Sequence, residues 1–443
     1  MSVNTTAKKK ITADSDHTLN NVPDTSRKKW LPIFVVLLGF TFLSTTMAAG
    51  ANLGISFTLT DLIKILLVGS LILSMYTALI SGISAKTGLN SVLLARYSLG
   101  TYGAKWADIV LGGTQVVWYA VQSAYMGDIF SRGLGLEEYF VPITIFWSLF
   151  MGAFALWGTK GMEIIGYLAV PPFLYLAYKL PTLGIEAAGG VGNLFLIEPL
   201  TTMTFSAAVT TVIGTFVSGG TNAPNWARFA KTPKQAFTAS FLAFFIGTVV
   251  MVACGMIGGL AIQVGDMVEI MMNMGIIVMG VVILIFNIWT TNTATAYAFG
   301  VAASEFFNKP NKAPFVIGGL IIATIMAVTG IYNVFMSFLI ALGVFIPPLG
   351  GIIIGDYFYS WKKVFPKIEF VRFRKARYAN WIAYILSTVG AYVSSVYEVG
   401  IPSLNGIILA IIFVYVVNKI FESLKISDKH EILDDAEYMY KVN

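Results

Sequence analysis

The sequence predicts an all-α membrane protein with twelve transmembrane helices, in which the first ten form two inverted repeats of five. Only 12% of the 443 residues are charged and 56% are hydrophobic, whereas a soluble protein has about 25% charged residues. Apolar stretches of about 20 residues, enough to cross a bilayer, recur along the chain. A short phrase, Thr-Phe-X-Ser, occurs at 41–44 and again at 215–218.

The apolar stretches define the expected organisation of the chain. They divide it into a first repeat (31–180), a second repeat (205–355) and two appended helices (379–422). The polar residues 1–30 predict a disordered cytoplasmic leader without a cleavable signal peptide, and residues 424–443 predict a solvated cytoplasmic tail. The stretches lie at 31–50, 62–84, 106–130, 140–158, 162–180, 205–220, 236–262, 272–304, 314–331, 334–355, 379–397 and 403–422.

Positive charge is concentrated on one predicted side of the membrane. With both termini in the cytoplasm, all of the 29 Lys and Arg residues except Lys64, Arg132 and Lys179 fall on the cytoplasmic side. This positive-inside pattern predicts a multi-pass protein of the plasma (inner) membrane. It also accounts for the net charge of +6 without a nucleic-acid partner. The single cysteine, Cys254, permits no intrachain disulfide and no redox or metal motif.

Both copies of the repeated phrase precede glycine-containing stretches, 50–54 and 219–224, that predict breaks in the first and sixth spans. Unwound backbone inside a membrane is tolerated only where protein or a water-filled cavity satisfies it. A pair of interrupted helices in corresponding halves therefore indicates the substrate site of a secondary transporter. The alternative is that both are ordinary glycine-kinked packing helices.

A second pair of landmarks supports the repeat. The segment 115–118 in the third span corresponds to 287–290 in the eighth, at nearly the same spacing as the two phrases. Repeats of five spans enter the membrane from opposite sides, which is the inverted arrangement of the leucine-transporter type.

The predicted spans offer oxygen ligands for a cation but no good carboxylate or histidine for proton transfer. Asn287, Thr290 and Thr291 share one helix face, and hard cations prefer oxygen ligands. Carbonyl groups of Gly39 and Phe42, near the first break, are expected to complete a sodium site. The alternative is that the threonine hydroxyls bond to their own helix backbone.

A substrate site is expected between the third and sixth spans. Gln115 and Trp118 project from one helix face together with Gln122. An amide beside an aromatic ring suits a planar heterocycle, whose edge is hydrogen-bonded and whose face is stacked. Phe216 is the expected opposite ring, and the stretch from Ser218 through Gly219 to Gly220 is expected to expose backbone groups. Ser44, in the first phrase, is the remaining candidate.

At these residues the sequence resembles the nucleobase:cation symporter-1 (purine-cytosine permease) family, and within it the bacterial cytosine permeases most closely. This resemblance implies the leucine-transporter-type fold, a base between Trp118 and Phe216, and sodium near Gly39, Phe42, Asn287, Thr290 and Thr291. The matching segments are spread over nearly the whole chain. They are 85–89, 94–96, 112–116 with Trp118, 228–229, 287–292 and 347–351.

We therefore predict a sodium-coupled importer of a neutral nucleobase, with cytosine first and no cofactor besides the ion, acting as a monomer. A purine, hydantoin, allantoin or hydroxymethylpyrimidine substrate, proton coupling, and an amino-acid carrier on the same fold are the alternatives. Small residues at 48–51, where the family carries a bulkier stretch, suggest a cavity enlarged toward purines. The predicted spans contain no paired carboxylates or catalytic histidine, which argues against an enzyme.

Overall fold

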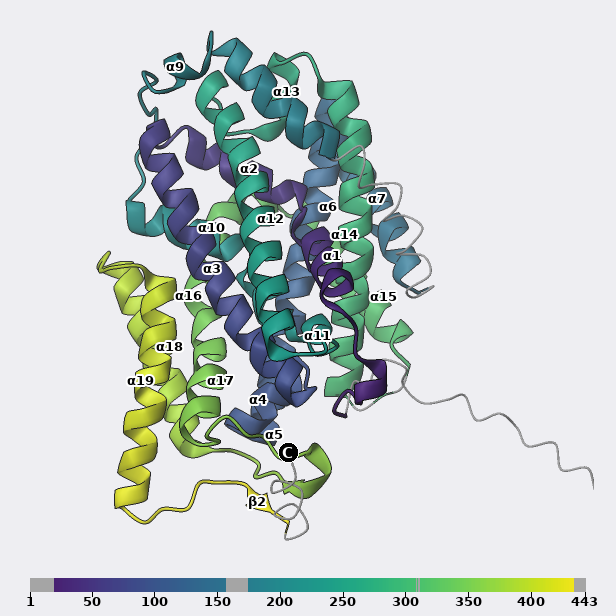
Figure 1. Ribbon diagram of the computed structural model, residues 1–443. Helices are drawn as coiled ribbons and strands as arrows, with labels where there is room; N and C mark the ends of the chain where they lie inside the picture. Colours follow the sequence, from purple (N-terminus) through teal and green to yellow (C-terminus); the bar gives the residue numbers. More distant parts are fainter. Residues whose placement is uncertain (1–19, 157–173, 308, 310, 434–443) are drawn as a thin grey trace, which may run out of the picture.

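The computed structural model describes residues 20–156, 174–307, 309 and 311–433, and it is built almost entirely of helices (Figure 1). Four predicted segments extend outside the described residues: the leader, the fourth span at 140–158, the fifth span at 162–180 and the tail. In the first half the helices are α1 (Trp30–Thr41), α2 (Ser44–Gly54), α3 (Leu59–Thr87), α4 (Ser91–Leu99), α5 (Thr101–Ala107), the π-helical turn η2 (Asp108–Gly112), α6 (Gly113–Gly133), α7 (Phe140–Leu156), residues 174–187 and α9 (Val191–Leu194).

The second half continues the helical pattern and ends in a short clasp of two strands. The helices are α10 (Phe205–Asn222), α11 (Pro224–Ala227), α12 (Pro233–Ile262), α13 (Met267–Asn273), α14 (Ile277–Phe306), α15 (Ala313–Val328), α16 (Phe335–Phe345), α17 (Pro347–Tyr359), α18 (Tyr378–Val396) and α19 (Pro402–Ser423). The strands are β1 (Val371–Arg372) and β2 (Glu431–Ile432), which pair antiparallel. Single 3-10 turns lie at Asp24–Ser26, Glu137–Tyr139, Ile331–Val334 and Ile368–Phe370.

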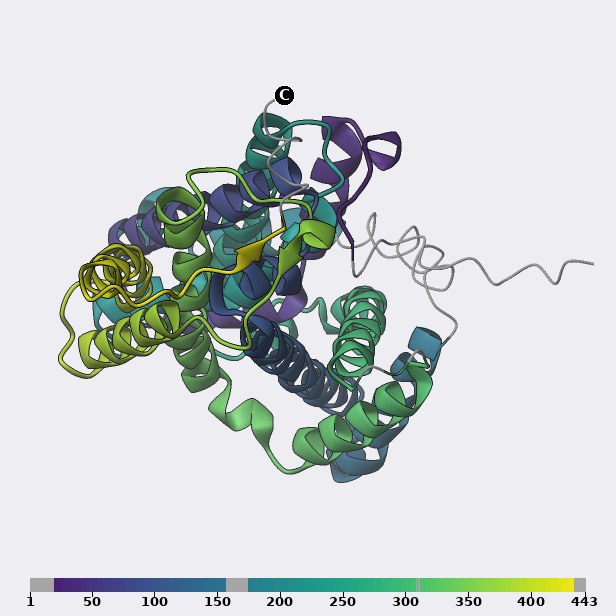
Figure 2. The same cartoon turned by 90° about the horizontal axis from the view of Figure 1, so that it is seen from below.

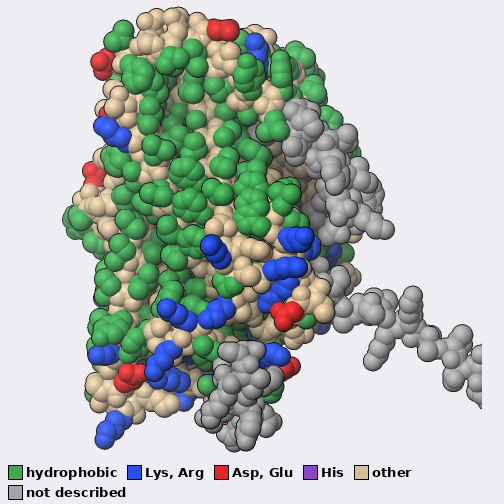
Figure 3. Space-filling view, viewed as in Figure 1, with side chains coloured by type: hydrophobic (Ala, Val, Ile, Leu, Met, Phe, Trp, Pro, Cys, Tyr) green, Lys and Arg blue, Asp and Glu red, His purple; other side chains and the backbone are tan. Residues whose placement is uncertain are grey.

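The described helices include six that are long and apolar enough to span a membrane. A seventh span is the pair α1 and α2, which are bent by 55° at a short break. The helical, apolar part of the prediction is therefore confirmed, while the number of twelve spans stays a prediction. Figure 3 shows hydrophobic side chains covering most of one face, with Lys and Arg gathered toward its lower end, which we call the basic end.

The helices pack in three groups. One group contains α1, α2, α3, α10 and α12; a second contains α6, α7, α14 and α15; and α17 to α19 form the third, while α16 packs mainly against α10. Figure 2 shows α18 and α19 at one flank of the molecule and the second group away from them. In the predicted numbering the first group holds spans 1, 2, 6 and 7 and the second holds spans 3, 4, 8 and 9, so spans five apart share a group.

The first break does not lie at 50–54, where the sequence predicted it. Residues 50–54 are helical within α2, and the chain is unwound at Phe42 and Leu43, inside the repeated phrase itself. The glycines serve close packing instead, because a Cβ atom on Gly50 would lie 2.2 Å from the backbone oxygen of Val252 in α12. Small residues allow helices to approach this closely in a membrane.

The second predicted break is also displaced. Helix α10 continues through Gly219 and Gly220 to Asn222, and the chain turns only at Ala223 before the short helix α11. A Cβ atom on Gly219 would meet the ring of Phe40 at 2.4 Å. The stretch from Ser218 to Gly220 is thus buried helix rather than exposed backbone.

The end of the predicted leader packs onto the basic end. Residues 20–29 are described, and the Arg27 guanidinium donates to the backbone oxygens of Ala85 and Arg228. Lys28 and Ala230 form a parallel bridge. Within the described residues, the leader is therefore ordered from residue 20 onward, contrary to the expectation for 1–30.

The start of the predicted tail is also docked rather than solvated. The Asp428 carboxylate accepts from the backbone N–H groups of Tyr378 and Ala379 at 3.0 and 2.9 Å, which satisfies donors at the start of α18. Buried His430 accepts at Nδ1 from the Arg374 N–H, at 3.1 Å, and its Nε2 lies 3.0 Å from the Tyr97 oxygen. The tail thereby joins α18 to α4.

A buried ion pair anchors the same region. Arg377 and Asp356, both nearly inaccessible, lie 2.7 Å apart. Asn380 and Trp361 also donate to the Asp356 carboxylate, at 2.8 and 2.9 Å. A buried carboxylate is tolerated when its partners satisfy it in this way. Asp356 therefore belongs to a helix-end interface.

Docking of the tail is expected to weaken in mild acid. Burial, and secondarily Arg377, lowers the pKa of His430 to about 4 from an ordinary value of 6.5. An undocked tail takes up a proton below about pH 6.5, whereas the docked tail does so only near pH 4. The contribution of neutral His430 is therefore complete above pH 6.5 and is lost as the pH falls toward 4.

A dye on a cysteine introduced at Lys429, in a Cys254→Ser background, should become more mobile at pH 5 than at pH 7.5 by fluorescence anisotropy. The same label in a His430→Gln chain serves as the control and should lose most of this pH dependence. Equal anisotropy at both pH values in the chain that keeps His430 would contradict the prediction.

Candidate functional site

A small cavity of about 40 Å³ lies where α1, α2, α6, α10 and α14 meet. None of the described side chains that line it is charged. They are Phe40, Leu43, Gln115, Trp118, Gln122, Thr215, Phe216, Gly219, Thr291, Ala294 and Thr295. The cavity is large enough for about three water molecules, so a heterocyclic ligand requires the walls to move apart.

Helix α6 supplies one wall of the cavity. Gln115, Trp118 and Gln122 follow at one to two turns and project from one face, and all three are buried. The Trp118 ring is braced edge-on by Phe335 and Phe338, at centroid distances of 6.1 and 5.5 Å. Its orientation is thus held from behind by α16.

The amide groups on this wall differ in how they are satisfied. The Gln115 Nε2 donates to the Ser218 hydroxyl at 3.4 Å, and Thr114 shares that hydroxyl at 2.8 Å. The Gln122 Oε1 is buried and receives no hydrogen bond from a described residue. Because an unsatisfied buried acceptor is costly, Gln122 offers a site for a ligand N–H.

Helix α10 supplies the opposite wall. Phe216 is buried, and it packs against Phe40 and Phe244 at centroid distances of 6.4 and 6.2 Å. The ring centroids of Phe40 and Trp226 are also 5.2 Å apart. Phe40 comes from the last turn of α1, so the aromatic lining on this side depends on the position of the broken span.

The break at Phe42 and Leu43 is held by one side chain of α14. The Asn287 Nδ2 donates to the Phe42 oxygen at 3.0 Å, and its Oδ1 accepts from the Ser44 N–H at 3.0 Å. One amide therefore satisfies backbone groups on both sides of the unwound residues, for which lipid offers no partner.

The threonines of the predicted sodium site hydrogen-bond to their own helix, which is the alternative that the sequence left open. The Thr290 and Thr291 hydroxyls both donate to the backbone oxygen of Asn287, at 2.7 and 2.8 Å. Each hydroxyl oxygen retains lone pairs for a cation. The structure brings the Asn287 face to the break at Phe42, with Gly39 one turn earlier in α1.

The predicted substrate residues converge well. The cavity is lined by four of them: Gln115, Trp118, Phe216 and Gly219. Ser218 does not line it, but its hydroxyl accepts a hydrogen bond from Gln115. Ser44 is buried but outside the lining. The residues at 48–51 are buried in α2 and do not line the cavity, so their small size does not enlarge it toward purines.

Gln122 lies on the face of α6 that the sequence analysis named, and it also lines the cavity. Several other lining residues were not predicted. Leu43 and Thr215 lie within the two copies of the repeated phrase, so the pattern could have included them. Phe40, Ala294 and Thr295 carry no distinctive sequence signal. They reach the cavity only because α1 and α14 cross there.

A charged cluster ties α6 to the short helix α13 at the end opposite the basic end. Arg132 Nη1 lies 3.2 Å from the Asp128 carboxylate and 3.1 Å from that of Asp266. Asp128 is thus ion-paired near the end of α6. The cluster holds α13 across this end of the molecule.

The helix arrangement and the uncharged cavity at a broken span define a multi-pass membrane transporter. Residues 21–418 match the sequence profile described as permease for cytosine/purines, uracil, thiamine, allantoin, and the chain belongs to this family. The resemblance to the nucleobase:cation symporter-1 family is thereby confirmed.

Two relatives illustrate the range of the family. The cytosine permease of Escherichia coli (strain K12) is 32% identical over 381 residues, covering 86% of this chain and 89% of the relative. The allantoin permease of Bacillus subtilis (strain 168) is 23% identical over 439 residues, covering 85% and 87%. Both are permeases, and the chain is a transporter rather than an enzyme.

Solved structures show the same fold. Mhp1 in an inward-facing conformation superposes with a TM-score of 0.79 at 14% identity, covering 95% of this chain and 96% of that one. A closed conformation of Mhp1, a nucleobase-cation-symport-1 family transporter with bromovinylhydantoin bound, gives 0.72 at 15% identity, covering 92% and 96%. The chain therefore has the Mhp1-type transporter fold.

Replacement of Asn287 is expected to destabilise the protein more than replacement of Thr290. Asn287→Ala leaves the Phe42 oxygen and the Ser44 N–H unsatisfied, at a cost of about 1–3 kcal/mol for each group. Thr290→Val removes only a bond within α14. Thermal unfolding in detergent should show a clearly lower midpoint for Asn287→Ala, and equal midpoints for the two variants would contradict this role.

Proposed function

We propose that the protein is a sodium-coupled importer of a neutral nucleobase, with cytosine as the first candidate. The observation that carries this proposal is a cavity that combines two aromatic rings, Trp118 and Phe216, with two amides, Gln115 and Gln122. The rings suit the faces of a planar heterocycle and the amides suit its edge. Similarity to a cytosine permease over most of the chain supports cytosine.

The uncharged lining favours a neutral substrate over a zwitterion. An amino-acid carrier would need groups that compensate an ammonium and a carboxylate, and the described lining contains no such charge. Allantoin, hydantoins, hydroxymethylpyrimidines and purines keep the planar, hydrogen-bonding character of cytosine. The relative that transports allantoin makes these the second candidates.

Sodium is proposed to bind where the break meets α14. The ligands would be carbonyl oxygens of Gly39 and Phe42 with side-chain oxygens of Asn287, Thr290 and Thr291. The Asn287 bonds to both sides of the break support this location, because an ion there would act on the broken span and on the cavity that contains Thr291. The carboxylate open to the proton-coupled alternative is Asp128, which is ion-paired with Arg132 and lies outside the cavity lining.

The protein is proposed to act as a monomer in the plasma (inner) membrane with both termini cytoplasmic. The gathering of Lys and Arg at one end of the molecule supports this orientation (Figure 3). The ends of the described chain, at residues 20–29 and 424–433, both dock at that basic end.

Loss of the aromatic rings or of the first amide should abolish substrate binding. Trp118→Ala, Phe216→Ala and Gln115→Ala are each expected to eliminate uptake of radiolabelled cytosine while the protein still inserts into the membrane. Phe345→Ala, on an exposed ring of α16 outside the cavity, is the control and should transport normally. Unchanged uptake in Trp118→Ala would refute stacking.

The ion site is expected to be separable from the base site. Thr291→Ala should weaken the stimulation of uptake by sodium, because it removes one oxygen ligand. Thr293→Val provides a comparison on the same helix, because the Thr293 hydroxyl donates to the backbone oxygens of Met151 and Trp289. Uptake that stays the same when choline replaces sodium would remove the sodium site from the proposal.

A further inference from the structure

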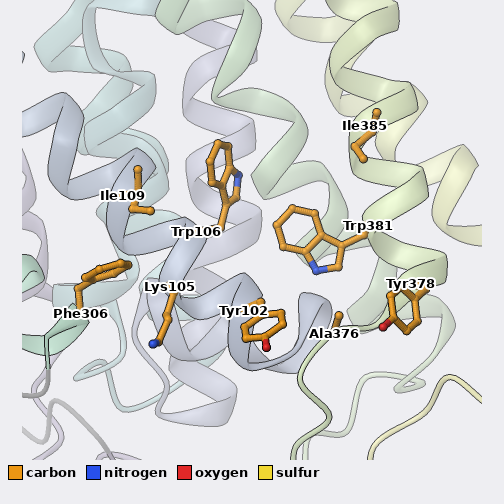
Figure 4. A pocket seen from close by; sticks show the side chains of 9 residues that line it. All are labelled: Tyr102, Lys105, Trp106, Ile109, Phe306, Ala376, Tyr378, Trp381 and Ile385. Atoms are coloured by element: carbon orange, nitrogen blue, oxygen red, sulfur yellow. The ribbon is translucent and has the colours of Figure 1, made fainter.

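A larger hollow of about 540 Å³ opens on the lateral surface near the basic end. It lies between α5 with η2, the end of α14, and the start of α18 (Figure 4). It has no lining residue in common with the transport cavity. A function for it is therefore independent of the transported substrate.

Two tryptophans form the floor of this hollow. The rings of Trp106 and Trp381 have centroids 6.4 Å apart. The indole N–H of Trp106 donates to the Tyr384 hydroxyl at 3.1 Å, and that of Trp381 donates to the Leu99 oxygen at 3.0 Å. Both rings are thus fixed by hydrogen bonds, and they present a rigid apolar surface.

The polar groups of the hollow gather at one end. Figure 4 shows the Lys105 nitrogen and the Tyr102 and Tyr378 hydroxyls in the lower part of the view. All three side chains are exposed. Lys105 lies 5.6 Å from the centre of the Phe306 ring and makes no ion pair with a described residue. Among the described side chains, this end therefore presents one positive charge without an ion-pair partner beside two hydroxyl groups.

The other end of the hollow is apolar. Figure 4 shows Ile109 and Ile385 in the upper part of the view, on the two sides of the tryptophan pair. Their exposed fractions are 51% and 56%. Each belongs to a helix that continues toward the centre of the membrane, η2 with α6 and α18. The hollow therefore changes from cationic to apolar along the direction in which a lipid lies.

We propose that this hollow binds one anionic phospholipid, with its phosphate at Lys105 and an acyl chain along Ile109, Trp381 and Ile385. The charge complementarity of Lys105 selects a negative headgroup. Tryptophan and tyrosine are the residues that occupy the level of lipid headgroups, and anionic lipid attracts a basic side chain at this level. The hollow is thus a lipid site of the basic side rather than part of the transport route.

The test uses the purified full-length protein, delipidated in detergent and titrated in native mass spectrometry. Phosphatidylglycerol and phosphatidylcholine with identical acyl chains serve as the two probes. The first phosphatidylglycerol is expected to bind several-fold more tightly than the first phosphatidylcholine. Equal affinity for the two lipids would overturn the assignment of a charged headgroup site.

Two variants locate the binding. Lys105→Gln should lower the affinity for phosphatidylglycerol about fivefold, the effect of one basic side chain near a membrane surface. It should lower the affinity for phosphatidylcholine less, because the choline group of that lipid already compensates its phosphate. Lys419→Gln is the matched control, because Lys419 is also exposed beside an aromatic ring, at 5.2 Å from Tyr415, but does not line the hollow. Equal effects of the two substitutions would refute the site.

Ile385→Trp tests the apolar end by filling it, and it should weaken the binding of both lipids. If Lys105→Gln fails to insert, the comparison of the two lipids on the unmodified chain decides the charge assignment. The delipidated protein could instead form a dimer that Ile385→Trp dissociates. That result would show that a second copy of the chain occupies the hollow, and it would overturn the proposal.

Discussion

The two hydrogen bonds that Asn287 makes across the break in the first span are the interaction on which the site depends. A membrane interior offers no partner to unwound backbone, so Phe42 and Ser44 need a polar group from the protein. Asn287 supplies it from α14, in the other predicted repeat, at 3.0 Å on both sides. The same contact places Phe40 and Leu43 at the cavity and sets the break beside Thr291. One residue, Asn287, therefore affects the stability of the fold, the proposed substrate site and the proposed ion site.

Close helix approach elsewhere keeps this arrangement in place. Gly50 in α2 packs against the backbone of α12, and Gly214 in α10 packs against the backbone at Leu339 in α16. At the basic end, the buried Arg377 and Asp356 pair and the docked tail connect α17 and α18 with α4. The lipid-facing hollow lies beside this anchored region, on helices that the anchor holds. The molecule thus combines an anchored basic end with a cavity whose aromatic wall includes Phe40 from α1, beside the break.

Helical periodicity explains why part of the site could be predicted. Gln115, Trp118 and Gln122 share a face whatever the helix packs against, and Phe216 follows from the repeated phrase. The exact break could not be predicted in the same way. Glycine marks both an unwound turn and a close helix contact, and only the neighbouring helix distinguishes them. Residues 50–54 meet α12 and stay helical. Phe42 and Leu43, neither of which is glycine, are unwound, and Asn287 satisfies the Phe42 oxygen and the Ser44 N–H there.

Composition and spacing indicated a helical membrane transporter with candidate substrate residues on the third and sixth spans, and the resemblance of its motifs indicated the nucleobase permease family. These features depend on properties local to the sequence: hydropathy, charge asymmetry and the 3.6-residue turn. The tertiary structure decided which backbone is unwound, that the start of the tail is docked, and that Phe40, Leu43 and Thr295 belong to the cavity. Each of these features depends on residues far apart in the chain, because the free-energy cost of a buried polar group or of a cavity is set by the residues that surround it.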